Sequence, residues 1–210
     1  MSSGNSFSQI AALSIHDVKN DLAQLAAEAQ ARGDRNSQNI AMRSADTLSR
    51  LLCFYKSETH DLHVQIEAQD PHELIVDLLE RQASRIQAQT QIQVRTHVEE
   101  APDLWFYDST LIDMVLANGL QNALRFARQN IDISVTTHAT YLEICIQDDG
   151  TGYPPNLLSE SYDSSPISMQ GTGLGISLAR RILALHRNGE QQGEIKLSND
   201  NGAKFQVLLP

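Results

Sequence analysis

The sequence contains little cysteine, few aromatic residues and no excess of basic charge. Its two cysteines, Cys53 and Cys145, fall in a helix-like and a strand-like segment and match no metal-binding spacing. Buried thiols in a reducing compartment are therefore expected. The chain has 16 basic and 26 acidic residues, a net charge of -10. This balance argues against a protein that binds nucleic acid or anionic membranes through a basic surface.

Long apolar runs are also absent. No run approaches the roughly 20 residues that span a bilayer, and the first residues show neither the basic nor the apolar region of a secretory signal. We therefore expect a cytoplasmic protein. The charge is distributed unevenly: residues 1–60 carry six basic and six acidic residues, whereas residues 61–210 carry ten and twenty. A neutral front and an acidic rear predict two domains with these bounds.

The front domain is predicted to be a helical hairpin. Residues 7–31 contain no Gly or Pro, Gly33-Asp34 predicts a tight turn, and a second helix is expected from about Arg35 to Ser57. Both helices carry apolar residues at heptad spacing. These are Ala11, Ile15, Val18, Leu22, Leu25 and Ala29, then Ala41, Ala45, Leu48, Leu52 and Tyr55. Two hairpins packed as a four-helix bundle would bury both seams, so we expect a homodimer. Packing on the rear domain of the same chain is the alternative.

The rear domain is predicted to be α+β. Helices are expected over 71–89, 111–127 and 174–185, the second capped by Ser109 or Thr110. Strands are expected over 91–98, 105–108, 131–137, 141–147, 193–198 and 204–208. The last four predict two hairpins and therefore a mostly antiparallel sheet.

Three clusters in the rear domain suit nucleotide chemistry. Asn118 and Asn122 lie one helical turn apart, and Arg125 follows. A carboxamide oxygen suits Mg²⁺ and a guanidinium suits phosphate. A strand ends at Asp148, whose carboxylate can accept a hydrogen bond from an amine. The glycines of the second and third clusters permit close backbone approach and expose a helix N-terminus to phosphate. They are Gly150 and Gly152, then Gly171, Gly173 and Gly175. Taken singly, each cluster is weak evidence. A polar helix face is the more common explanation of the first cluster, a simple turn after a strand can explain the second, and the third is a weak motif.

One residue of the first helix also has a suggestive setting. His16 is followed by Asp17, which could take its proton, and by Asn20 one turn later. In isolation such a histidine is more often an ordinary solvated residue.

The order and spacing of these clusters resemble the N, G1 and G2 boxes of the histidine-kinase/gyrase/Hsp90-type ATPase domain. The run from His16 to Asn20 resembles the phosphoacceptor motif of histidine-kinase dimerisation domains. The two resemblances together span nearly the whole chain, which is therefore similar to sensor histidine kinases. The fold implied is a dimeric helical bundle followed by a two-layer α/β sandwich that binds ATP.

The resemblance implies roles for single residues of the rear domain. Asn122 would ligate Mg²⁺, Asn118 would line the phosphates, and Asp148 would bind the adenine amine. The five glycines would begin and end a flexible lid over ATP.

In the front domain, the resemblance implies that His16 is phosphorylated, with Asp17 as the base. Asn20 would assist dephosphorylation of a partner. The implied activity is autophosphorylation from ATP, followed by transfer to the receiver aspartate of a response regulator.

Some residues depart from the family pattern. Asp21 stands where proline is common, and residues 153–170 contain no Lys or Arg, so Arg125 or Arg128 would have to supply a cation to the γ-phosphate. Only 15 residues precede His16, so sensory input is expected from a separate protein. A histidine phosphotransferase that relays phosphate, with a non-catalytic ATP-like domain, is the alternative function. An anti-sigma serine kinase is disfavoured, since such kinases lack a histidine-bearing hairpin.

Overall fold

The computed structural model describes residues 3–59, 61–158 and 173–210 of the chain. The chain divides into two compact units, Met1–Leu62 and His63–Pro210. Each unit is described by itself below. Among the described residues, no helix is both long enough and apolar enough to cross a membrane.

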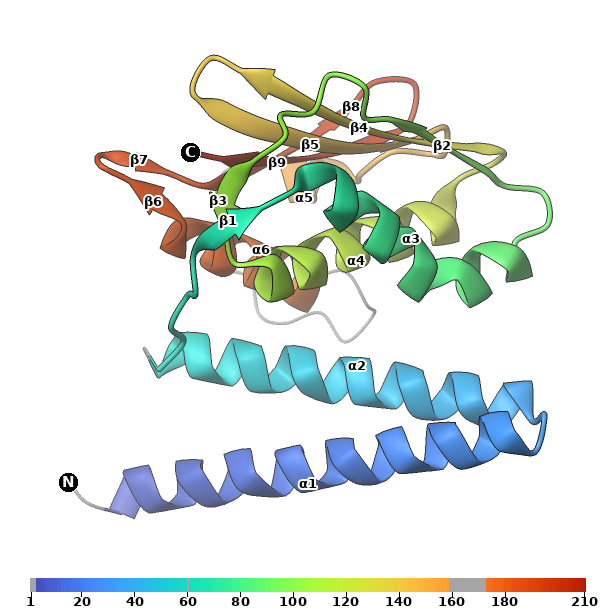
Figure 1. Cartoon of the computed structure of the whole chain (residues 1–210), viewed down its shortest axis with the longest axis vertical. Coiled ribbons are helices and arrows are strands. Elements are labelled where there is room, and N and C mark those ends of the chain that lie inside the picture. Colours follow the sequence, from blue (N-terminus) through green and yellow to red (C-terminus); the bar gives the residue numbers. More distant parts are fainter. Residues whose placement is uncertain (1–2, 60, 159–172) are drawn as a thin grey trace. The chain divides into compact units, whose positions relative to one another are not determined.

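The first unit is a hairpin of two long helices (Figure 1). They are α1 (Ser3–Ala31) and α2 (Arg35–Glu58), as the heptad spacing predicted. Gly33 adopts a φ of 71°, which ends α1. Asp34 then caps α2, because its Oδ1 accepts a hydrogen bond of 3.0 Å from the Ser37 N–H.

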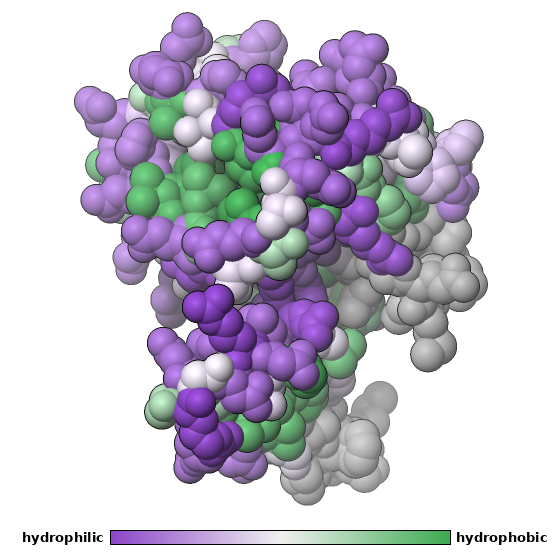
Figure 2. Space-filling model, turned by 90° about the vertical axis from the view of Figure 1, so that its right-hand side faces the viewer, coloured by the Kyte–Doolittle hydropathy of each residue, from purple (hydrophilic) through white to green (hydrophobic). Residues whose placement is uncertain are grey.

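The predicted apolar seam of the hairpin divides into two parts. Ala29 and Ala41 are buried, and Leu22 is half-buried. Val18 and Leu25, in contrast, are 47% and 43% exposed. On α2, three further apolar residues are exposed; these are Ile40, Met42 and Leu51. Figure 2 shows hydrophobic residues reaching the surface among the hydrophilic ones. A single hairpin therefore leaves apolar surface uncovered.

The second unit is built on a five-stranded sheet of order β2-β4-β5-β9-β8. The strands are β2 (Gln93–His97), β4 (Asn130–His138), β5 (Tyr141–Asp148), β8 (Glu194–Asn199) and β9 (Ala203–Leu209). Only the β2–β4 pair among them is parallel. Helices α3 (Pro71–Ala88), α4 (Ser109–Phe126) and α6 (Gly173–Leu185) cover one face (Figure 1). The predicted α+β class, with a mostly antiparallel sheet and two C-terminal hairpins, is confirmed.

Side chains alternate along the strands as a sheet covered on one face requires. In β4, Ile131, Ile133 and Val135 are buried, while the residues between them are partly exposed. The buried residues face the helices, where Leu116 and Leu120 of α4 are fully enclosed. This packing fixes α4 against the sheet and so fixes the side chains that α4 presents.

The cap of α4 differs from the prediction. Asp108, and not Ser109 or Thr110, is the N-cap residue, because its Oδ1 accepts a hydrogen bond of 3.0 Å from the Leu111 N–H. Asp108 also joins two helices. Its own N–H donates to Nε2 of the buried His186 (3.1 Å), just beyond α6. The N-terminus of α4 is thereby tied to the C-terminus of α6.

Four small elements were not predicted. The first is strand β1 (Glu67–Gln69), which pairs antiparallel with the predicted strand β3 (Trp105–Tyr107). Strands β6 (Arg187–Asn188) and β7 (Gln191–Gln192) form a minimal hairpin after α6, and α5 (Pro155–Leu158) is a single turn. Elements of two to four residues are too short to show a periodic pattern.

Candidate functional site

Asp148 lies at the end of β5 with its side chain only 6% exposed. Its Oδ1 accepts hydrogen bonds from the Gly150 N–H (2.7 Å) and the Ala203 N–H (3.2 Å). Both bonds use Oδ1, so among the described residues Oδ2 is the oxygen left for a ligand. Burial raises the pKa of Asp148, and the two N–H donors oppose this effect. A buried carboxylate with one free oxygen is a directional acceptor for an amine.

The neighbouring Asp149 has a different task. Its carboxylate accepts hydrogen bonds from the backbone N–H groups of Arg128 (2.7 Å), Gln129 (3.0 Å) and Asn130 (3.0 Å). The Asn130 side chain adds a fourth donor at 3.1 Å. Burial acts to raise the pKa of Asp149, but these donors outweigh it and bring the pKa down to about 2. Asp149 therefore ties the turn after β5 to the α4–β4 connection.

The α4 helix supplies the polar side chains on the other wall of the site. Asn118 is buried, at 8% exposure, and its Nδ2 has no hydrogen-bond partner among the described residues. Asn122 is half-buried one turn later. Arg125 is exposed near the helix end, with its guanidinium carbon 5.1 Å from the centre of the Phe126 ring.

The N-terminus of α6 meets this wall. A Cβ on Gly175 would collide with the Asn118 carboxamide, so only glycine permits this approach. Gly173 is the first residue of α6, and Gly171 lies outside the described residues. The structure thus brings the asparagine of α4 and the glycine-rich start of α6 together.

These residues fit a nucleotide and its metal ion. A buried donor without a partner is costly unless a ligand or water satisfies it, and Asn118 Nδ2 is such a donor. A helix N-terminus favours phosphate, and so does a guanidinium such as that of Arg125, two turns after Asn118 on α4. The carboxamide oxygen of Asn122 is a ligand that Mg²⁺ accepts. The turn at Gly150 packs directly against the Phe126 carbonyl at the end of α4. This contact fixes the turn that follows Asp148 relative to α4.

His16 lies in the first unit, on α1, with a side chain that is 56% exposed. Its Nδ1 is 3.3 Å from Asn20 Nδ2 and 3.5 Å from Asp17 Oδ1. The predicted trio is therefore together on one helix surface. Because both neighbours approach Nδ1, Nε2 is the nitrogen left for chemistry.

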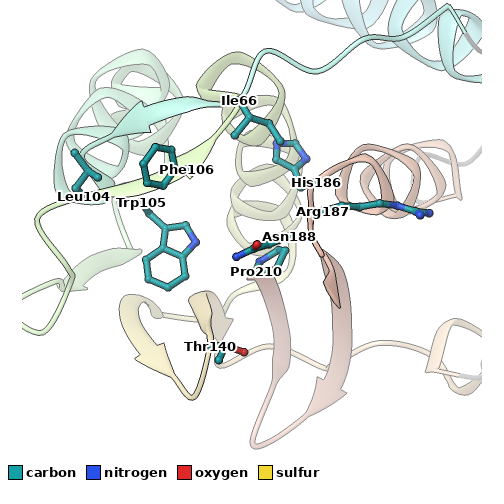
Figure 3. A pocket seen from close by; sticks show the side chains of 9 residues that line it. All are labelled: Ile66, Leu104, Trp105, Phe106, Thr140, His186, Arg187, Asn188 and Pro210. Carbon is teal, nitrogen blue, oxygen red and sulfur yellow. The ribbon is translucent and has the colours of Figure 1, made fainter. Parts of the chain in front are cut away.

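A separate cavity of about 650 Å³ lies beside β3 and contains none of the residues predicted for the site (Figure 3). It is lined by Ile66, Leu104, Trp105, Phe106, Thr140, His186, Arg187, Asn188 and Pro210. Its walls are mainly apolar, without the carboxylate and glycine turn that nucleotide recognition needs. Trp105, the one tryptophan of the chain, is a spectroscopic reporter at this place.

Sequence reasoning missed three residues that hold the site in shape. Asp149 lies in the turn after β5 and binds the α4–β4 connection, Asn199 contacts Tyr153 at the end of the turn, and the Ala203 N–H donates to Asp148 at its beginning. Asp149 is adjacent to Asp148, but nothing in the sequence separates a ligand-binding carboxylate from a structural one. Asn199 and Ala203 are some fifty residues away. The β5–β9 pairing brings Ala203 beside Asp148, and the β8–β9 pairing places Asn199 opposite Ala203.

Comparison with known proteins agrees with this geometry. Residues 107–210 match the family of histidine kinase-, DNA gyrase B-, and HSP90-like ATPases. The sensor protein SrrB of Staphylococcus aureus is 29% identical over 116 residues, which cover 51% of this chain and 19% of SrrB. The chain thus matches about one fifth of the length of that relative.

Solved structures of histidine kinases share the fold. The catalytic domain of ThkA superposes with a TM-score of 0.58 at 26% identity, covering 70% of this chain and 95% of ThkA. AdeS of Acinetobacter baumannii gives 0.60 at 18% identity and covers 91% of this chain and 94% of its own. Full-length ShkA, solved in complex with AMPPNP, gives 0.69 at 17% identity over 96% of this chain and 45% of its own. The chain is therefore similar to sensor histidine kinases: residues 107–210 carry an ATPase domain of the histidine kinase-, DNA gyrase B- and HSP90-like family, and the fold is that of histidine kinase structures.

Proposed function

We propose that this protein is an ATP-dependent protein-histidine kinase that phosphorylates His16 and passes the phosphoryl group to the aspartate of a response regulator. One observation carries the proposal. An exposed histidine, with Asp17 and Asn20 at its Nδ1, lies on a helix of the same chain as an ATPase-type domain.

The nucleotide would be held from both ends. Oδ2 of Asp148 would accept a hydrogen bond from the adenine amine. Asn118 Nδ2, Arg125 and the α6 N-terminus at Gly173 and Gly175 would contact the phosphates. Asn122 would ligate Mg²⁺, which when bound neutralises charge that develops on the phosphates.

The contacts of His16 bear on which nitrogen attacks. A proton on Nδ1 can be donated to Asp17, and this tautomer leaves the Nε2 lone pair free. Donation from Asn20 to Nδ1 instead requires the proton on Nε2, where it blocks attack. Contact with Asp17 is therefore the productive one. In the transfer, a bond forms between Nε2 and the γ-phosphorus, the bond to the ADP oxygen breaks, and the Nδ1 proton passes toward Asp17.

The uncovered apolar surface of the hairpin supports a second copy of the chain as its partner. Val18 and Leu25 are seven residues apart, which places them on one side of α1. Two hairpins that packed these sides together would form a four-helix bundle. The response regulator would then approach His16 on the outside of this bundle.

The proposal is tested by incubating the pure chain with γ-labelled ATP and Mg²⁺. Label should appear on the wild type, be stable to base and labile to acid, and be absent from His16→Gln. His72→Gln is the matched control, because His72 is also an exposed histidine on a helix. Label that persists in His16→Gln would exclude this histidine as the acceptor.

A phosphate relay is the second candidate, favoured by the lack of Lys or Arg in residues 153–170. In that case the labelled phosphoryl group reaches His16 only from a phosphorylated receiver domain and never from ATP alone. The same experiment, run with and without the receiver, separates the two functions.

A further inference from the structure

The closing pair of the β8–β9 hairpin holds both ends of the turn 148–153. Asn199 and Ala203 are cross-strand partners at the tip of this hairpin. The Ala203 N–H donates to Asp148 Oδ1 at the beginning of the turn (3.2 Å). The Asn199 side chain contacts Tyr153 at the end of the turn. The hairpin therefore spans the segment that carries the base-binding carboxylate.

Asn199 makes two hydrogen bonds to the backbone of Tyr153. Its Oδ1 accepts from the Tyr153 N–H at 2.7 Å, and its Nδ2 donates to the Tyr153 carbonyl at 3.0 Å. The carboxamide thus uses both its acceptor and its donor on the backbone of one residue, as a neighbouring β-strand would. Two hydrogen bonds to one residue fix its orientation as well as its distance.

Gly152 completes this contact. Its φ of 79° is unfavourable for residues with a side chain, and a Cβ there would lie 2.7 Å from Asn199 Cγ. The backbone of Gly152 therefore packs flat on the Asn199 carboxamide. A side chain at position 152 would therefore push the turn away from the hairpin.

The charge of Asp148 reaches the Tyr153 phenol. Burial raises the pKa of the Tyr153 phenol, and the charge of Asp148 adds to this effect. A displacement of Tyr153 would therefore change the surroundings of the Asp148 carboxylate.

We propose that Asn199 is a positioning residue for recognition of the nucleotide base. It acts by holding Gly152 and Tyr153 at a fixed place relative to Asp148, and it does not touch the nucleotide. The inference rests on the proposed function, in which Asp148 binds the amine of adenine.

The test compares two nucleotides by calorimetry, Mg·ATP and Mg·ITP. ITP carries a carbonyl oxygen where ATP has its exocyclic amine, so it cannot donate to Asp148 there. The wild type should prefer ATP. Asn199→Ala should bind ATP about tenfold more weakly, because two hydrogen bonds that fix the turn are lost. ITP affinity should fall less, so the ATP:ITP preference shrinks at least threefold.

Gln147→Ala is the matched control. The Gln147 side chain also donates to this hairpin, to the Asp200 carbonyl at 2.9 Å, but makes no recorded bond to Tyr153. It should leave the ATP:ITP preference unchanged. Asn199→Asp keeps the size and the acceptor but lacks the donor, so it should also lose at least threefold of the preference. It replaces Asn199→Ala if thermal unfolding shows that the alanine variant does not fold.

The outcomes are distinguishable. Wild-type protein that binds neither nucleotide would overturn the proposed function and the inference with it. Wild-type preference for ATP that Asn199→Ala and Asn199→Asp retain would overturn the inference alone. An equal loss of ATP and ITP affinity would also overturn it, since that result indicates general damage to the fold.

Discussion

Asp148 and Asp149 are adjacent carboxylates, and the structure predicts opposite results when each is changed to asparagine. In Asp148→Asn, the amide oxygen can still accept from the Gly150 and Ala203 N–H groups. In the proposed binding mode the NH₂ group would then replace Oδ2 and face the adenine amine, so that two donors meet. Because burial disfavours the charged form of Asp148, the neutral variant should be at least as stable as the wild type.

The expected loss of affinity follows from the bond that is removed. A hydrogen bond to a charged group is worth about 1.5–3 kcal/mol. At about 1.4 kcal/mol for each factor of ten, Mg·ADP should bind roughly 10- to 150-fold more weakly. Calorimetry measures the affinity, and urea unfolding followed by Trp105 fluorescence measures the stability.

Asp149→Asn is the control with the reverse outcome. One amide oxygen cannot serve the four donors of Arg128, Gln129 and Asn130, and the new NH₂ group would face some of them. The free energy of unfolding should fall by about 1–3 kcal/mol. Nucleotide affinity should change less than in Asp148→Asn. If Asp148→Asn binds Mg·ADP like the wild type, or if only Asp149→Asn loses binding, the assignment of the two carboxylates is wrong.

Three further predictions concern other parts of the chain. Leu25→Glu should halve the mass seen by light scattering without loss of helix content, because Leu25 is exposed on the single hairpin; an unchanged mass would exclude this seam. Burial lowers the pKa of His186, so as the pH falls this histidine is protonated in the unfolded chain before it is protonated in the folded chain. Stability should therefore fall as the pH drops below about 6.5, by at most about 1.4 kcal/mol per pH unit for this one proton. Urea unfolding of wild type and His186→Gln at several pH values, followed by Trp105 fluorescence, measures this slope, which the variant should reduce. Asn20→Ala should preserve labelling of His16 but slow dephosphorylation of a partner receiver domain; equal effects on both rates would contradict the assigned role.

Local patterns predicted most of the fold because they are periodic. The heptad spacing located α1 and α2, alternation located β2, and two β-like runs located β4 and β5. The same spacing could not say which part of the seam a single hairpin covers: Leu22 is half-buried, whereas Leu25 is exposed. Which α1 residues are covered depends on how α2 packs against α1. A sequence with apolar residues at every a and d position does not contain this information.

The cap of α4 illustrates a different limit. Asp108, Ser109 and Thr110 are all good N-cap residues, so the sequence offers three starting points for one helix. The choice falls on Asp108 because its carboxylate also accepts from the Gln65 N–H at 2.9 Å and its own N–H meets His186. These partners are far away in the sequence. Tertiary contacts therefore decide among residues that local propensity ranks equally.

The candidate site also combines residues that local motifs identify with residues that only tertiary contacts bring into place. Short motifs pointed to Asn118, Asn122 and Asp148, which we propose bind the nucleotide and its metal ion. The residues that hold Asp148 in place are spread over three elements: Asp149 reaches the α4–β4 connection, and Asn199 and Ala203 come from the β8–β9 hairpin. Their side chains or N–H groups bind backbone and carboxylate, which many residue types can do. A motif search finds the residues that we propose contact the nucleotide, while the geometry of the turn depends on contacts that only the folded sheet creates.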